Sequence, residues 1–248
     1  GPAPTKYLVG PSGSGAPYSS IQAAINAALA DLHGPADPAA VLVQPGTYTE
    51  NLSLAGGIHL TSTVDQRSFA VVVNGTVTMN TSGYTSASGF NFNGPNAATT
   101  LYFTGSNFQQ LFLNHCVVYS QNAAALVMDN SGPGSKVESK GGAFQINTGS
   151  NTPAVITAGL IESEETIYRN TSNTAVSLAL SNSATAWVRQ AELRGQITLT
   201  SASNLSLTLS TIESGTAVGV SAGSSGTVLL GNVGFNCTAF PNVITDAG

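Results

Sequence analysis

The sequence predicts an all-β chain that forms a parallel β-helix, a solenoid of rungs about 21 residues long, with one helix capping its N-terminal end. Between residues 155 and 233, apolar positions return at a constant interval of about 21 residues. The stretches between them are rich in Gly, Ser, Asn and Thr, and no helical periodicity runs through them. A coil that climbs by one strand spacing per lap explains both observations, because each inward residue then stacks on its counterpart in the next lap.

Three apolar series make up each lap, which indicates three short strands per turn of the coil. The series are Val155, Val176, Ile197, Val218; then Ile167, Val188, Leu209, Leu230; then Ala191, Ile212, Val233. We expect every member to face inward and to stack on the next without a shift of register. A propeller blade needs about 40 residues per repeat, and a leucine-rich repeat needs a Leu/Asn consensus that is missing here. A β-sandwich has no reason to keep a fixed period.

The composition limits the kinds of partner. Of the 248 residues, 42% are hydrophobic and only 8% are charged, so hydroxyl and amide groups must make up most of the polar surface. The formal net charge is −5 and the seven Lys and Arg residues are spread singly. We therefore expect no nucleic-acid partner. No run approaches the ~18 apolar residues of a membrane span, so we expect no membrane insertion.

We expect four segments along the chain. Residues 1–18 form a lead-in that starts with a tag-cleavage scar, residues 19–34 a capping helix, residues 35–235 the β-helix and residues 236–248 a C-terminal cap or tail. The helix should follow Ser19 and Ser20, because the next apolar residues recur at helical spacing. A solenoid needs such a cover for the core of its terminal rung. One lap, from Leu126 to Val155, is longer than the others.

Two stretches near the N-terminus carry a family pattern. They are Tyr18-Ser-Ser-Ile21-Gln-Ala-Ala-Ile25 and Val41-Leu-Val43-Gln-Pro-Gly-Thr-Tyr48-Thr-Glu50-Asn-Leu52. Together they resemble the opening of the pectin-lyase-like superfamily, in particular pectin methylesterases and β-helical phage tail and adhesin proteins. The resemblance extends roughly to Leu60 and implies a right-handed parallel β-helix. It implies little about activity, because the same opening rungs carry many functions.

The catalytic sets of that superfamily have no counterpart in this chain. Pectin methylesterases resemble one another in a Gln, two Asp on adjacent rungs and an Arg, whereas Asp129 is the single Asp between residues 66 and 245. Pectate lyases need several acidic residues for calcium, and polygalacturonases need a Gly-His-Gly and an Asp-Asp pair. We interpret the acidic cluster Glu162, Glu164 and Glu165 as a solvated turn. We therefore predict no metal site and no cofactor.

Glu192 and Glu213 are the weak catalytic candidates that remain. One period of the apolar pattern separates them, so we expect them to stack outward on neighbouring rungs. Their Cα atoms would then be about 5 Å apart, near the carboxyl separation of retaining glycosidases. The preferred alternative is a solvated Glu/Arg patch with Arg169, Arg189 and Arg194.

Aromatic residues gather in the middle of the chain. Eight of them occur between residues 84 and 119: Tyr84, Phe90, Phe92, Tyr102, Phe103, Phe108, Phe112 and Tyr119. Strand alternation places about half inside, and we expect Tyr102, Phe112 and Tyr119 to face out. The preferred interpretation is packing against another subunit or a loop, and the alternative is a platform on which a glycan stacks.

The two cysteines, Cys116 and Cys237, lie far apart in the chain and should not be bonded to each other, because several rungs separate them. Cys116 fits the inward pattern that starts at Leu101, so we interpret it as a small core residue rather than a nucleophile. Cys237 lies in the predicted tail.

Taken together, these features favour a non-enzymatic β-helical structural or attachment protein. We expect a phage or viral surface component, such as a spike, tail or capsid decoration, located on a virion or an extracellular surface and able to bind a host glycan or other virion proteins. The alternative is a polysaccharide-acting enzyme of the pectin-lyase-like superfamily: a lyase, esterase or glycosidase. A long flank with few charges favours a homo-oligomer, with a trimer preferred over a monomer.

Overall fold

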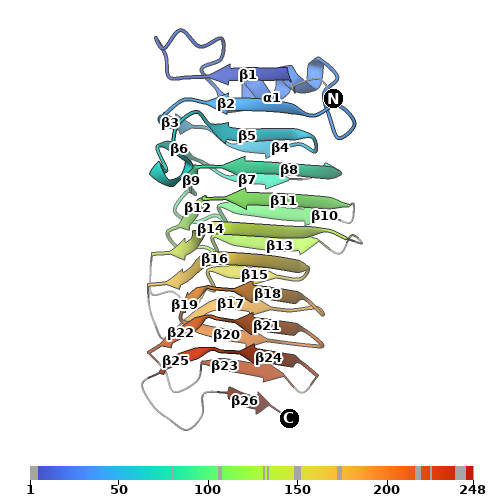
Figure 1. Cartoon of the computed structure of the whole chain (residues 1–248), viewed down its shortest axis with the longest axis vertical. Helices are drawn as coiled ribbons and strands as arrows, with labels where there is room; N and C mark the ends of the chain where they lie inside the picture. The colour runs from blue at the N-terminus through green and yellow to red at the C-terminus, as the bar shows by residue number, and fades with distance from the viewer. Residues whose placement is uncertain are drawn as a thin grey trace.

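The computed structural model describes residues 5–79, 81–105, 108–130, 132, 134–147, 152–171, 175–215, 219–223, 225–237 and 244–247. They form an elongated right-handed parallel β-helix with the two termini at opposite ends (Figure 1). Every strand pairing along it is parallel. The predicted fold class is therefore confirmed. No helix in the described ranges is long and apolar enough to cross a membrane.

The solenoid has three faces, and the chain visits them in order once per lap. The first face contains β1 (Thr5–Val9), β2 (Ala39–Val43), β5 (Ile58–Ser62), β8 (Gly83–Ser88), β11 (Gln109–Asn114), β14 (Lys136–Ile146), β16 (Leu160–Asn170), β18 (Thr185–Arg189), β21 (Asn204–Thr208) and β24 (Thr227–Gly231). The second contains β3 (Gly46–Thr49), β6 (Val71–Asn74), β9 (Phe90–Asn93), β12 (Val117–Ser120), β19 (Glu192–Arg194), β22 (Thr211–Ser214), β25 (Gly234–Cys237) and the second halves of β14 and β16.

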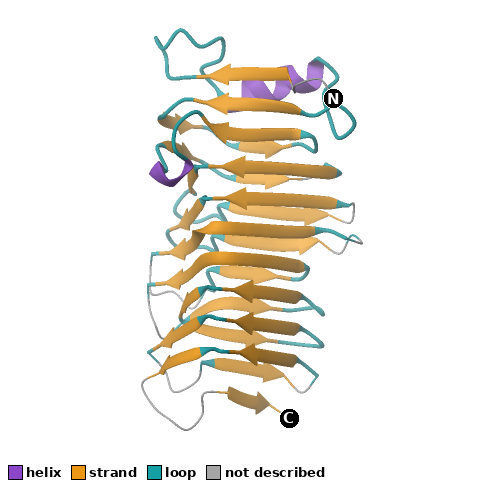
Figure 2. Cartoon of the chain, viewed as in Figure 1, coloured by secondary structure: helices purple, strands orange, loops and turns teal. Residues whose placement is uncertain are grey.

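The third face is a separate sheet. It contains β4 (Leu52–Leu54), β7 (Val77–Met79), β10 (Leu101–Gly105), β13 (Leu126–Asn130), β15 (Val155–Thr157), β17 (Val176–Leu180), β20 (Gln196–Leu199), β23 (Val220–Gly223) and β26 (Ile244–Ala247). Figure 2 shows the helical parts, which are α1 (Ile21–Ala30) and the short 3₁₀ helix η1 (Gln66–Ser68), against this background of strands.

The constant register that the sequence pattern predicted is wrong. Val155 pairs with Leu178, which pairs with Ile197, so the first of these two laps is longer than the second. Val176, the expected partner of Val155, is displaced by two positions and is half-buried beside a bulge. A shift of two leaves a residue on the same side of its strand, so the sequence pattern hides it. The lengthened lap is confirmed, because Leu126 pairs with Val155.

A single residue in the left-handed region turns the chain from the first face to the second in seven successive laps. These corner residues are Gly89, His115, Gly141, Glu165, Gln190, Leu209 and Asn232, with φ between 49° and 81°. The backbone ladder continues across the corner, since the N–H of His115 donates to the Lys140 carbonyl at 2.8 Å and that of Leu209 to the Gly231 carbonyl at 2.8 Å. The fold therefore turns this corner without a loop.

The corner explains which members of the second and third apolar series are misplaced. Leu209 occupies a corner and is 50% exposed, while Leu207 takes the inward place beside Val188. Ile167 faces outward on the second face at 38% exposure. Ile212 is inward as predicted, but its partner in the preceding lap is Leu193 rather than Ala191.

Helix α1 covers the N-terminal end of the core, as predicted. It buries Ile21, Ala24, Ile25 and Ala28, and it packs against β1, β2 and β4. The Ser20 side chain caps it by accepting from the Ala23 N–H.

A second cap comes from Glu50, which directly follows β3. Its carboxylate accepts from Ser20 Oγ at 2.7 Å, the Ile21 N–H at 2.8 Å and the Gln22 N–H at 3.0 Å. Negative charge at a helix N-terminus is stabilising because the first backbone N–H groups have no partner inside the helix. The hydrogen bonds of Glu50 thus join the two stretches that carry the family pattern.

Both predicted chain ends contain strands. Thr5–Val9 lies in the expected lead-in, yet it pairs with β2 and adds a rung. In the expected tail, Asn236 and Cys237 continue β25, and β26 pairs with β23, so the ladder does not break at residue 236.

Relieving one strained corner should stabilise the chain. A left-handed conformation costs a leucine about 1–2 kcal/mol, and asparagine tolerates it better. We expect Leu209→Asn, the residue type of the next corner at Asn232, to raise the free energy of unfolding by about 0.5–1 kcal/mol. Chemical denaturation measures the change. The control is Leu229→Asn, an exposed leucine within β24, which should give no gain; equal stabilisation by both would contradict the role of the corner.

Removing the long-range helix cap should loosen the N-terminal end. We expect Glu50→Gln to lower the free energy of unfolding by about 1–3 kcal/mol, because charge-assisted bonds to otherwise unpaired backbone donors are lost. Hydrogen exchange should report faster opening of α1 amides. Glu165→Gln removes the same charge from an exposed corner and should leave α1 exchange unchanged.

Candidate functional site

The first face carries three straight columns of outward side chains. We call them the leading, middle and trailing columns, in the order in which each strand meets them. The middle column is Ala40, His59, Ser86, Phe112, Glu138, Glu162, Trp187, Ser206 and Leu229. The leading column runs Tyr84, Gln110, Lys136, Leu160, Thr185, Asn204 and Thr227, and the trailing column Ser88, Asn114, Lys140, Glu164, Arg189 and Thr208.

A cleft of about 340 Å³ lies over the middle and trailing columns on β14, β16, β18 and β21. Its lining includes carboxylates, cations, hydroxyls and one indole: Glu138, Lys140, Glu162, Glu164, Trp187, Arg189, Ser206 and Thr208. Trp187, the one tryptophan in the sequence, is 53% exposed. A cleft with an open aromatic face and convergent polar groups is the usual form of a small-ligand site.

Lys136 joins the two carboxylates of the middle column. Its Nζ lies 2.6 Å from Glu162 Oε2 and 2.9 Å from Glu138 Oε2. Hydrogen bonds to Glu162 and then to Glu138 raise the pKa of Lys136. The carboxylates of Glu138 and Glu162 are therefore both held by the ammonium group of Lys136.

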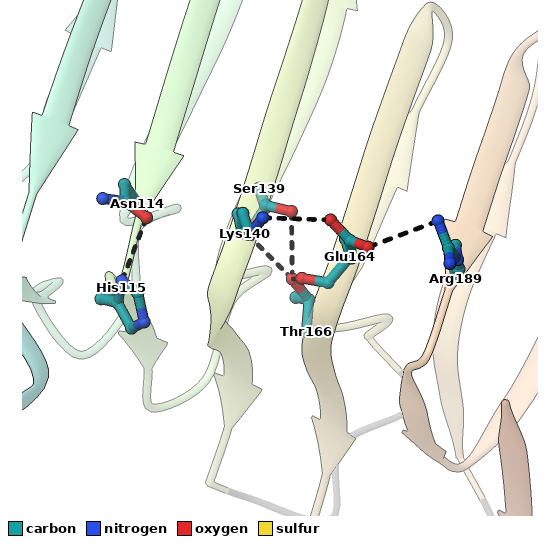
Figure 3. Close-up of polar contacts among 7 residues, drawn as sticks. All are labelled: Asn114, His115, Ser139, Lys140, Glu164, Thr166 and Arg189. Atoms are coloured by element: carbon teal, nitrogen blue, oxygen red, sulfur yellow. Dashed lines mark hydrogen bonds and ion pairs between the residues drawn. The ribbon is translucent and has the colours of Figure 1, made fainter. Parts of the chain in front are cut away.

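Glu164 is held in the same way on the trailing column. Its Oε2 lies 3.3 Å from Lys140 Nζ and its Oε1 lies 3.6 Å from Arg189 Nη1. Figure 3 shows this row across three neighbouring strands. Lys140 and Arg189 remain at least half exposed, so their remaining N–H groups can reach a ligand in the cleft.

Buried hydroxyls support the floor beneath the glutamates. Ser139 and Ser163 are register partners that face inward, Ser139 between the outward Glu138 and Lys140 and Ser163 between the outward Glu162 and Glu164. Ser139 Oγ lies 3.1 Å from Thr166 Oγ1 (Figure 3), and Tyr168 donates to Ser163 Oγ at 2.8 Å. Burial raises the pKa of Tyr168, so it remains a donor. Satisfied buried networks of this kind rigidify a core.

The predicted platform of Tyr102, Phe112 and Tyr119 is not one surface. Tyr102 is outward on β10 of the third face, Phe112 on β11 of the first and Tyr119 on β12 of the second. Only Phe112 shares the column of Trp187. Three strand spacings separate these two rings, which gives about 14 Å, with Glu138 and Glu162 between them.

The expected stacking of Glu192 on Glu213 is also wrong. The register pairs Glu192 with Thr211 and places Arg194 beside Glu213. Arg194 Nε contacts Glu192 and lies 3.5 Å from Glu213 Oε2. The bond to Glu192 raises the pKa of Arg194. Of the three arginines expected in the Glu/Arg patch, Arg194 pairs with both glutamates and Arg169 is its register neighbour, whereas Arg189 lies on the first face beside Glu164.

The acidic cluster is not the solvated turn that the sequence predicts. Glu162 and Glu164 lie on strand β16 and face the cleft, and only Glu165 occupies a turn, as a corner residue. Sequence reasoning missed the cleft because Glu138, Glu162 and Trp187 are spaced more widely along the chain than the period of the apolar pattern. An inward serine between two outward charged residues, from Glu138 to Lys140 and again from Glu162 to Glu164, was the available signal.

The remaining candidates behave as core or supporting groups. Cys116 is buried and free, as predicted, and burial raises the pKa of its thiol to about 12. His115 Nδ1 contacts Asn114 Oδ1 at 3.0 Å (Figure 3), and Arg67 donates to His115 Nε2 at 3.4 Å. No group of three or more His, Cys, Asp or Glu within the described ranges is arranged to hold a metal ion.

Comparison with known proteins supports the fold. No protein-family model and no curated protein sequence matches the chain. A crystal structure of the pectin methylesterase from Aspergillus niger, in deglycosylated form, matches with a TM-score of 0.63 at 12% identity, over 97% of this chain and 92% of that one. A second structure, in penultimately deglycosylated form, matches with a TM-score of 0.53 at 14% identity, over 100% and 92%. The chain therefore has the pectin-lyase-like fold. At this identity the likeness establishes the fold alone.

Proposed function

We propose that this chain is an attachment protein that holds a surface glycan along the middle column of its first face. The observation that carries the proposal is the exposed Trp187 beside ion-paired carboxylates and cations in one cleft. Aromatic faces stack on sugar rings, and charged groups with fixed geometry bond their hydroxyls. A pyranose ring is about as wide as one strand spacing, ~4.8 Å. A linear oligosaccharide that runs parallel to the long axis can therefore reach Phe112 and Trp187 together.

The ion pairs favour binding over cleavage of the glycan backbone. Hydrolysis of a glycosidic bond needs one carboxylic acid that donates its proton to the leaving oxygen. Glu138 and Glu162 both face the ammonium of Lys136, and Glu164 faces two cations. Carboxylates in such pairs are suited to accept hydrogen bonds from sugar hydroxyls. The rival function, a polysaccharide-acting enzyme, is supported by the stacking of Glu138 on Glu162 in adjacent rungs.

The wider setting that we propose is a phage or viral surface, as a spike, tail or capsid decoration, or another extracellular surface. The low charge and hydroxyl-rich surface support it, as does the resemblance of the opening rungs to β-helical phage tail and adhesin proteins. Other virion proteins would then be the neighbours of this chain. The alternative of pectin ester hydrolysis draws support only from the fold of the Aspergillus niger enzyme.

Glycan binding should change the fluorescence of the one tryptophan. We expect an array of capsular and O-antigen polysaccharides to yield a ligand that quenches Trp187. Titration calorimetry should then show at least tenfold weaker binding for Trp187→Ala, a loss of about 1.4 kcal/mol. Tyr119→Ala, which removes an outward aromatic from the second face, is the matched control and should bind normally. Equal affinity of the Trp187 variant and the parent would contradict the site, and so would an array without any ligand.

The third face supports the proposal of a homo-oligomer, with a trimer preferred. Its outward column contains a continuous apolar run of Tyr102, Val127, Ile156 and Ala179, followed by Thr198 and Ser221. A second copy that covers this run would remove exposed apolar area from water.

Light scattering should give about three times the chain mass of 25.0 kDa. We expect Ile156→Lys to shift the mass toward 25.0 kDa, because it buries a charge in the interface. Thr198→Lys, two rungs further along the same column, should change it less. A parent protein of single-chain mass at every concentration would exclude the oligomer.

A further inference from the structure

The middle column carries a serine–histidine pair two and three rungs before Glu138. His59 on β5 and Ser86 on β8 are register partners that both face outward. His59 Nδ1 lies 3.0 Å from Ser86 Oγ. In the tautomer with its proton on Nε2, the imidazole accepts the hydroxyl proton of Ser86, which is the arrangement of a base and its nucleophile.

Its neighbours hold the imidazole in place and keep it neutral. The Tyr84 ring packs against the imidazole with 5.2 Å between centroids. Burial lowers the pKa of His59, so the ring is unprotonated near neutral pH. Ser86 Oγ has its hydrogen-bond partner in the imidazole of His59. Ser88 lies two positions later on the same strand, and among the described residues no histidine side chain is hydrogen-bonded to it.

The same column connects the pair with the glycan surface. Phe112 directly follows Ser86 in register, one strand spacing of ~4.8 Å away. A sugar ring stacked on Phe112 therefore carries its ring substituents next to Ser86. An acyl group on a hydroxyl of that sugar would lie within reach of the serine oxygen.

We propose that Ser86 is a nucleophile, activated by His59, that removes O-acyl groups from the bound saccharide. The substrate class rests on the proposed function, whereas the nucleophile itself does not. This activity would add ester hydrolysis to a surface that otherwise only binds.

The step balances with water as the co-reactant. Ser86 Oγ attacks the acyl carbonyl carbon and its proton passes to His59 Nδ1. The bond to the sugar oxygen then breaks, and that oxygen takes the proton from His59. Water attacks the acyl-serine ester with the same proton transfers, which releases the carboxylic acid and restores Ser86.

Tyr84 is the candidate to stabilise the oxyanion. It lies on the same side of β8 as Ser86, and its phenol O–H can donate to the negative charge that develops on the carbonyl oxygen. Burial raises the pKa of Tyr84, so the donor remains protonated. Loss of one such donor lowers kcat by about 10²–10³-fold in well-studied hydrolases.

The test uses the full chain with a fluorophosphonate probe, p-nitrophenyl acetate and an acetylated xylo-oligosaccharide. We expect the probe to label Ser86, as peptide mass mapping would show. We expect Ser86→Ala and His59→Gln to lower kcat/KM for p-nitrophenyl acetate at least about 100-fold. Tyr84→Phe keeps the ring against His59. We expect this variant to lower kcat/KM for p-nitrophenyl acetate at least about tenfold, and that loss would come from the missing hydroxyl alone.

Ser88→Ala is the matched control and should retain labelling and turnover within twofold of the parent. Circular dichroism and quenching of Trp187 by the saccharide show whether each variant is folded and binds. Labelling at another residue, or equal turnover by Ser86→Ala and the parent, would overturn the proposal while leaving the glycan site intact. Turnover at Ser86 without saccharide binding would instead overturn the binding function and keep the nucleophile.

Discussion

The left-handed corner between the first two faces is the constraint on which the rest of the coil depends. One residue there reverses the alternation of the strand and turns the chain, while its N–H still donates to the next lap. Because no loop intervenes, laps of different length can absorb their extra residues only at the other two corners. The first and second faces therefore stay in register from β8 to β24. Most corners are not glycine, so several laps store about 1–2 kcal/mol of strain each.

Strict register on the first face creates the candidate functional surface. Parallel strands at ~4.8 Å place outward residues of successive laps in straight lines. Charges that are far apart in the chain, such as Lys136 and Glu162, then meet at 2.6 Å. A chain with few charged residues can in this way assemble a polar cleft, and the inward serines beneath it keep the two long strands β14 and β16 closely paired.

The same geometry separates groups that look alike in sequence. Outward residues on different faces point away from one another, so the aromatic residues of the middle laps cannot act as one platform. Phe112 and Trp187 share a face although they are far apart in the chain, because register rather than distance along the chain decides the grouping. The pair His59 and Ser86 belongs to this line as well.

The sequence by itself determined the class of fold, the helix after Ser20, the inward place of Cys116 and the lengthened lap that starts at Leu126. These follow from local signals: alternation, helical spacing, a cap residue and the length between apolar runs. Only the tertiary structure decided the register. Laps of unequal length leave apolar residues inward under several alignments, because a shift of two preserves the side of the strand. The neighbours of each outward residue depend on that shift. Glu138, Glu162 and Trp187 therefore come together in one cleft only in the folded coil, and Glu213 lies beside Arg194 rather than beside Glu192.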